Sequence, residues 1–134
     1  MTTPRQPILN HPNDGRIYKL GAAENTQVIF KADGEEVANQ YAITEWWMDQ
    51  SAPSPAPHVH EHNDELIYVL AGPVMVLIGE EWTQMEKGGL AVIPAGTKHT
   101  FRNDSDQRVG ILNLLMSGAY EAMMPQIQMM FANQ

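Results

Sequence analysis

The sequence predicts an all-β domain, and three observations support this prediction. Seven short segments, none longer than nine residues, are rich in Val, Ile, Tyr, Trp or Thr, as β-strands are. Turn signals such as Asp33-Gly34, Gly72-Pro73 and Gly79-Glu80 separate these segments. The chain has 134 residues and is 43% hydrophobic, which suits one domain of ordinary size with its own core. We therefore expect a single sandwich or barrel over residues 1–134.

The predicted elements follow one another without an internal repeat or a linker. Residues 1–15 carry three prolines and end at Asn13-Asp14-Gly15, so we expect an N-terminal arm there. A short helical turn is expected in the tail, residues 117–134, with Ser117 as its cap and Pro125 as the residue that ends or bends it at Met124. The strands expected between the arm and the tail are Thr26–Ala32, Tyr41–Met48, Glu65–Ala71, Val74–Ile78, Gly89–Ile93, Thr97–Phe101 and Gln107–Leu115.

Composition excludes several classes of protein. The formal charge of −8 and the pI of about 4.9 disfavour nucleic acid and anionic membrane surfaces as partners. Because the chain has no cysteine, a disulfide, a thiolate nucleophile and a Cys-ligated metal are all excluded. The longest apolar run, Leu66–Gly79, is interrupted at Gly72-Pro73 and is shorter than a membrane span. The first ten residues lack the apolar stretch of a signal peptide, so we expect a cytoplasmic protein.

Histidines and one carboxylate form a candidate metal site. His58 and His60 are two residues apart, a spacing that places both imidazoles on one face of a strand. Glu65 opens the next predicted strand, and His99 follows a tight turn at Ile93–Gly96, for which the residue types favour a type I turn. Imidazoles and a carboxylate suit Fe, Mn, Ni, Cu or Zn. Taken alone, the His58–His60 pair is also consistent with a solvated strand end.

The spacing of these residues resembles the two motifs of the cupin superfamily. The first motif is Gly, five residues, His-x-His, three or four residues, Glu, six residues, Gly, and the second is Gly, five residues, Pro-x-Gly, two residues, His, three residues, Asn. Nine of the ten fixed positions match across residues 52–103; the exception is Ala52, where the first motif opens with Gly. The matching residues are His58, His60, Glu65, Gly72, Gly88, Pro94, Gly96, His99 and Asn103.

The resemblance implies a cupin jelly-roll β-barrel, also called a double-stranded β-helix, with a short C-terminal helix and a site inside the barrel. It implies one divalent transition metal ion held by His58, His60, Glu65 and His99, the set that binds the metal in cupins. His62 shares the parity of the first two histidines, but the motif has no ligand there. We therefore expect His62 on the rim, with a role as an alternative ligand left open.

Strand parity predicts an apolar pocket around this site. If Glu65 and His99 point inward, so do Ile67, Val69, Thr97 and Phe101. Lys98 and Arg102 then point outward, which argues against a phosphosugar substrate. Parity does not fix the side of Arg108, nor which of the adjacent Trp46 and Trp47 faces the pocket. The Pro-rich stretch, residues 51–57, is expected to be extended, as a surface loop or as a rigid rim of the pocket.

Two apolar surfaces of the sequence need a partner. Leu66, Tyr68 and Leu70 form the outward face of a strand whose inward face is equally apolar, and this predicts a homodimer. The methionines of the tail fill the core or form a lid or dimer contact. They lie in a stretch that comprises Met123, Met124, Met129, Met130 and Phe131.

Three functions are consistent with the sequence. The chain resembles the quercetin dioxygenase group in the sequence Gly-Ala-Tyr-Glu at Gly118–Glu121 and in the short gap between the motifs. This resemblance implies a metal-dependent dioxygenase that acts on a small uncharged or aromatic compound. In that group the glutamate at the position of Glu65 acts as a base or proton partner. The alternatives are a non-oxidative isomerase, epimerase or lyase that uses the same metal, and a cupin that binds a small ligand without turnover.

Overall fold

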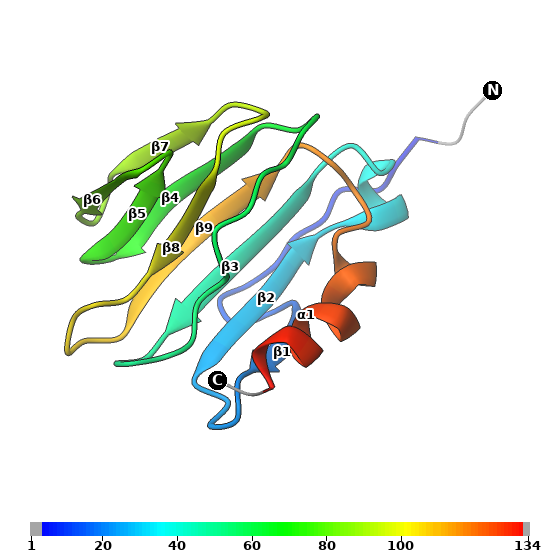
Figure 1. The fold of residues 1–134 in the computed structure, drawn as a ribbon. Coiled ribbons are helices and arrows are strands. Elements are labelled where there is room, and N and C mark those ends of the chain that lie inside the picture. The colour runs from blue at the N-terminus through cyan, green and yellow to red at the C-terminus, as the bar shows by residue number, and fades with distance from the viewer. Residues whose placement is uncertain (1–3, 133–134) are drawn as a thin grey trace.

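In the computed structural model, which describes residues 4–132, nine strands form two antiparallel sheets (Figure 1). The larger sheet has six strands in the order β1-β2-β3-β9-β4-β7, and the smaller has three in the order β6-β5-β8. The strands are β1 (Arg16–Leu20), β2 (Thr26–Ala32), β3 (Ala42–Met48), β4 (Glu65–Ala71), β5 (Val74–Ile78), β6 (Glu81–Met85), β7 (Leu90–Ile93), β8 (His99–Arg102) and β9 (Val109–Leu115).

All seven predicted strands exist, and three of them have the predicted bounds. The sequence analysis did not find β1 and β6. In β1, Arg16 and Lys19 interrupt the apolar pattern, although the strand pairs with β2 along its whole length. The polar strand β6 lies at the edge of the smaller sheet and has no buried residue, so its sequence lacks the hydrophobic signal of a core strand.

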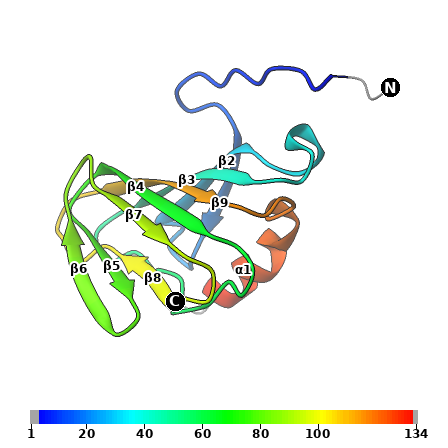
Figure 2. The same cartoon turned by 90° about the horizontal axis from the view of Figure 1, so that it is seen from above.

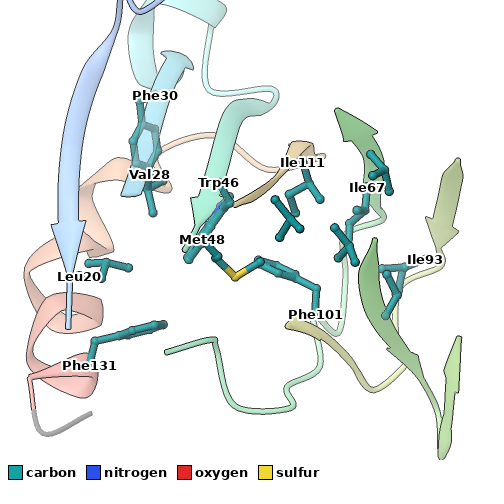
Figure 3. Packing of buried hydrophobic residues seen from close by; sticks show 14 of the residues in the cluster. Leu20, Val28, Phe30, Trp46, Met48, Ile67, Ile93, Phe101, Ile111 and Phe131 are labelled. Carbon is teal, nitrogen blue, oxygen red and sulfur yellow. The ribbon is translucent and has the colours of Figure 1, made fainter. Parts of the chain in front are cut away.

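The two sheets face each other and enclose the core. Alternate residues of β2, β3, β4 and β9 point toward the smaller sheet, as the period of two requires. Figure 3 shows Ile67, Ile111 and Trp46 from the larger sheet meeting Phe101 of the smaller one, and Trp46 and Phe101 make an edge-to-face contact with ring centroids 5.3 Å apart. This packing confirms the all-β jelly-roll architecture and fixes which side chains of each strand point inward.

The C-terminal segment is helical, but its bounds differ from the prediction. A 3₁₀ turn, η2 (Glu121–Met123), leads into the helix α1 (Met124–Phe131), so Pro125 lies in the first turn of the helix instead of ending it. Proline is tolerated there because the first helical N–H groups have no partner within the helix. Ser117 does not cap either element, and the cap of α1 is Met123.

The helix α1 completes the core on the inner side of the larger sheet. Figure 2 shows α1 and the smaller sheet on the same side of the larger one. Met124 and Phe131 are buried in the main hydrophobic cluster, so this part of the Met-rich tail fills the core, whereas Met129 and Met130 are exposed. The arm before β1 is exposed from residue 4 to residue 15. Within residues 4–132, no helix combines the length and the hydropathy that crossing a bilayer requires.

Candidate metal centre

The four residues that the sequence selects lie together at one end of the barrel. His58, His60, Glu65 and His99 each offer one ligand atom, and these atoms all lie within 4.8 Å of one another. Nε2 of His60 is 3.1 Å from Oε1 of Glu65, and Nε2 of His99 is 3.4 Å from the same oxygen. Glu65 and His99 are buried, while His58 and His60 are half-buried and face the opening.

The His58–His60 segment reaches this arrangement without forming the regular strand that we expected. His58 makes a single antiparallel bridge to His99, in which each backbone N–H donates to the other residue's carbonyl, at 3.0 and 2.9 Å. The carbonyl of His60 accepts a hydrogen bond from the backbone N–H of Gly96 at 2.9 Å. The extended backbone therefore keeps both imidazoles on the site although the ladder of a strand is missing.

The turn before His99 holds the two motifs together, and it is not the type I turn that we expected at Ile93–Gly96. Thr97 N–H donates to the carbonyl of Pro94, so the turn spans Pro94–Thr97, one residue later. Gly96 occupies its third position with φ of 86°, as a type II turn requires of a glycine. The side chain of Asp64 accepts a hydrogen bond from Ala95 N–H and so fastens this turn to the start of β4.

Backbone carbonyls orient two of the imidazole rings. Nδ1 of His58 lies 2.8 Å from the carbonyl of Ala56, and Nδ1 of His99 lies 2.9 Å from that of Thr97. Since a carbonyl only accepts, each Nδ1 carries the proton, and each Nε2 is left with its lone pair for a metal. Burial lowers the pKa of His58 despite its bond to the carbonyl, which favours the neutral, coordinating form.

Glu65 is the ionised centre of the cluster. Burial alone would raise the pKa of its carboxyl group, but the neighbouring His60 and His99 rings and the amide of Asn113 outweigh burial and bring the pKa to about 2. The carboxylate in turn raises the pKa of His99 above its ordinary value, although burial acts in the opposite direction. At neutral pH the site therefore presents a carboxylate among imidazoles, which is a suitable donor set for a divalent transition metal.

The surroundings of the buried Nε2 of His99 indicate whether a metal ion fits this site. This nitrogen has no hydrogen-bond partner in the structure. With its proton on Nδ1, His99 turns a lone pair toward the carboxylate of Glu65, and two such acceptors repel each other unless a cation lies between them. His60 faces the same oxygen at 3.1 Å. The donor chemistry of the four residues thus fits one divalent metal ion, which the ligand set leaves open to further coordination.

A cavity of about 640 Å³ opens onto the cluster. Trp46 and Phe101 form part of its wall, and Pro55–Pro57 lie at its edge, which supports the rim interpretation of the Pro-rich stretch. The C-terminal segment contributes Tyr120 and several apolar side chains to the wall. The complete lining is Trp46, Pro55, Ala56, Pro57, His58, Val59, His60, Glu65, Phe101, Asn113, Leu115, Tyr120, Met123, Ile127, Met130 and Phe131.

The charged side chains fall outside the cavity, as parity predicts. No Lys or Arg of residues 4–132 lines it. Lys98 pairs with Glu80, and Arg102 stacks on Trp82, 3.8 Å from the ring centroid. Arg108, whose side was open, pairs with Asp49 on the surface and lies over Trp47, so Trp46 is the inward tryptophan. The cavity is therefore apolar apart from the candidate metal ligands and two further residues.

Those two residues, Asn113 and Tyr120, were missed by the sequence analysis. Asn113 is buried on β9 and shares the inward parity of Ile111 and Leu115. Its signal was a lone amide within the apolar run Val109–Leu115. Of the wall residues that parity predicts, only Phe101 lines the cavity. Ile67 and Val69 point inward but are buried in the hydrophobic core, and Thr97 precedes β8 and belongs to the turn.

The remaining histidines lie away from the cluster. The side chain of His62 is 88% exposed and comes no closer to a carboxylate than 3.9 Å, from the neighbouring Glu61. It is therefore a rim residue, and the ligand group does not include it. His11 is exposed in the arm.

Comparison with known proteins places the chain in a family. Residues 45–115 match the cupin domain family, so the protein belongs to the cupins. A segment of 53 residues is 34% identical to an uncharacterized protein of Streptomyces coelicolor. This match covers 40% of the chain and 48% of the relative, so the chain spans about half the length of the curated protein that it matches.

Solved structures with low sequence identity share the fold. A crystal structure of a predicted oxalate decarboxylase from Thermotoga maritima superimposes with a TM-score of 0.74 at 13% identity, over 82% of this chain and 99% of that one. A cupin from Shewanella frigidimarina that is described as RmlC-like gives a TM-score of 0.70 at 12% identity, over 87% and 96% of the two chains. At these identities the likeness concerns the fold.

Proposed function

We propose that this cupin is a metal-dependent dioxygenase that acts on a small, uncharged, largely apolar compound carrying oxygen. The observation that supports it best is the pairing of an apolar cavity of about 640 Å³, lined by no Lys or Arg of residues 4–132, with the cluster of three histidines and one glutamate onto which it opens. A redox-active metal held by His58, His60, Glu65 and His99 would supply a Lewis acid for a substrate oxygen and a centre for oxygen chemistry.

The residues of the chain divide the remaining work. Trp46, Phe101 and the apolar side chains of α1 enclose a neutral substrate and exclude water from it. Asn113 holds the carboxylate of Glu65, and Glu65 accepts the proton that a substrate hydroxyl loses. Glu65 is ionised at neutral pH and can therefore accept this proton.

The class of substrate follows from the charges of the wall. A dianion such as oxalate, or a sugar phosphate, requires cations to replace its hydration, and the nearest candidates, Lys98, Arg102 and Arg108, are all engaged outside the cavity. Flavonol- or catechol-like compounds meet the requirement, in agreement with the resemblance of Gly118–Glu121 to the quercetin dioxygenase group.

Oxygen uptake with two metals tests this proposal. We expect protein loaded with Fe(II) or Mn to consume oxygen with a member of a flavonol and catechol panel, and Zn-loaded protein to consume none, because Zn has no redox chemistry. Glu65→Gln should lower turnover more than substrate binding, with metal content measured on the same sample. Equal conversion with Zn and Fe(II) and no oxygen uptake would favour the isomerase or lyase alternative. Binding without conversion would indicate a ligand-binding cupin.

A further inference from the structure

Tyr120 introduces a polar group into the apolar side of the cavity. Its ring packs on Phe30, with centroids 5.6 Å apart and an angle of 36° between the planes, and the residue also lines the cavity. The other polar side chain of the wall besides the candidate ligands, Asn113, lies beside Glu65. Within residues 4–132, by contrast, no side chain or backbone group forms a hydrogen bond with the Tyr120 hydroxyl.

A network outside the cavity fixes the position of Tyr120. The backbone N–H of the next residue, Glu121, donates to the carboxylate of Asp33. The side chain of Glu121 accepts hydrogen bonds from Arg16 and Tyr18, both at 2.6 Å. These contacts tie the chain at Tyr120 to β1 and to the end of β2, before the chain enters α1. The phenol is thus held in place by groups that have no contact with the cavity's contents.

The hydroxyl is a donor by default. A tyrosine is protonated at neutral pH, and its O–H can donate to any acceptor that enters the cavity. Burial, together with the negative charges of Glu65 and Asp33, raises the pKa of Tyr120 further. The residue is half-buried and lines the cavity, so its hydroxyl is accessible to a molecule that enters there. In this position the partner can come from a bound ligand.

We propose that Tyr120 is a substrate-binding residue whose hydroxyl donates a hydrogen bond to one oxygen of the substrate while a second oxygen is presented to the histidine cluster. The inference rests on the proposed function and deepens it, because it narrows the substrate to a neutral, mainly apolar compound with two oxygen atoms. Tyr120 lines the same cavity as His58, His60 and Glu65, so a ligand that fills this cavity contacts both groups.

The experiment is a binding comparison on Zn-loaded protein, in which no oxygen chemistry takes place. Catechol and o-xylene have nearly the same shape, and only catechol carries oxygen. We expect the wild type to bind catechol more tightly than o-xylene in isothermal titration calorimetry. Tyr120→Phe should weaken catechol binding about two- to tenfold, the range for loss of one hydrogen bond, and leave o-xylene binding unchanged.

Stability and metal content separate a binding role from a structural one. Because no hydrogen bond of residues 4–132 involves the Tyr120 hydroxyl, Tyr120→Phe should leave Tm nearly unchanged and retain Zn. The matched control is Tyr68→Phe, which lies on the exposed face of β4 and does not line the cavity, and it should leave the binding of both ligands unchanged. Unchanged catechol affinity in Tyr120→Phe, equal weakening of both ligands, or a wild type that does not prefer catechol would each overturn the inference. Absence of oxygen uptake with Fe(II) would instead count against the dioxygenase proposal alone.

Discussion

The two faces of strand β4 are similar in hydropathy but differ in solvent exposure. On the inner face, Glu65 is 5% exposed and Ile67 and Val69 are fully buried. On the outer face, Tyr68 is 42% exposed and Leu66 is half-buried, although both are as apolar as their inner neighbours. The strand shows that hydropathy alone does not decide which face is covered. The side that carries Glu65 is the inside, because the smaller sheet and the other ligands close over it.

The outer face continues across neighbouring strands. Leu66 lies opposite Val92, and Tyr68 lies opposite Leu90, in the pairing of β4 with β7. Val92 is 57% exposed and Leu90 is 53% exposed. Other residues of this chain therefore cover the inner face. The outer face is a continuous apolar surface that the described part of the chain leaves exposed.

The largest effect is expected at the ligands that the inner face helps to assemble. The triple variant of His58, His60 and His99 to Ala should lose bound metal completely, and each single variant should weaken binding, because a metal site needs its full donor set. Binding should also fade below about pH 6.5, where imidazoles take up protons. Elemental analysis of the purified variants measures the loss. His62→Ala is the matched control, since this exposed histidine lies outside the cluster. Full metal retention in the triple variant would show that the assignment is wrong.

The site was predictable from sequence because its residues are polar and fixed in spacing. His58, His60, Glu65 and His99 stand out from apolar strands, and the structure brings all four together. The cover of the cavity was not predictable in the same way, because Tyr120 and α1 lie in a segment without strand periodicity. The course of that segment is set by long-range contacts such as the one between Glu121 and Arg16.

The missed strands show the same limit in the fold. β1 was not recognised because its inner Tyr18 and Leu20 are interleaved with Arg16 and Lys19. Whether a short edge strand forms depends on its pairing with the neighbouring strand. A local sequence pattern contains no information about that neighbour. Pro125 is a related case, since the same residue can end one helix or begin another, and only the packing of Met124 and Phe131 decides.

The next largest effect is expected for the stability of the core. Ile67→Ala removes a fully buried side chain from the inner face and should lower the free energy of unfolding by about 3 kcal/mol. Leu66→Ala, one residue away on the half-buried outer face, should cost about 1 kcal/mol or less in the monomer. Urea denaturation of the two variants at equal low concentration compares them directly. Equal losses would mean that the two faces of β4 do not differ in burial as the structure describes.

A smaller effect is expected from the charge of Glu65 in metal-free protein. The pKa of this carboxyl group is about 2 in the folded chain, below its ordinary value of 4.5, so its ionisation stabilises the fold above pH 4.5. That contribution is lost as the pH falls toward 2, by roughly 2 kcal/mol between pH 4.5 and pH 3. Unfolding of the chelator-treated protein at both pH values measures it, and Glu65→Gln should show a correspondingly weaker dependence. An identical pH dependence in the two proteins would remove Glu65 as the source.

The smallest effect on the protomer itself is expected from a substitution on the outer face of β4. Its effect is measured on the oligomeric state. We propose that a second copy of this chain covers the surface of Leu66, Tyr68, Leu90 and Val92, because exposed apolar surfaces of this extent favour association. Light scattering should give about twice the chain mass of 15.0 kDa for the wild type. Tyr68→Glu should shift the mass to that of one chain, because a charge buried at an interface without a partner is costly. Metal content and the cavity should stay unchanged, since Tyr68 points away from both. A wild type that remains at the mass of one chain at high concentration would refute the dimer, and the exposed face of β4 would then be a property of the free protomer.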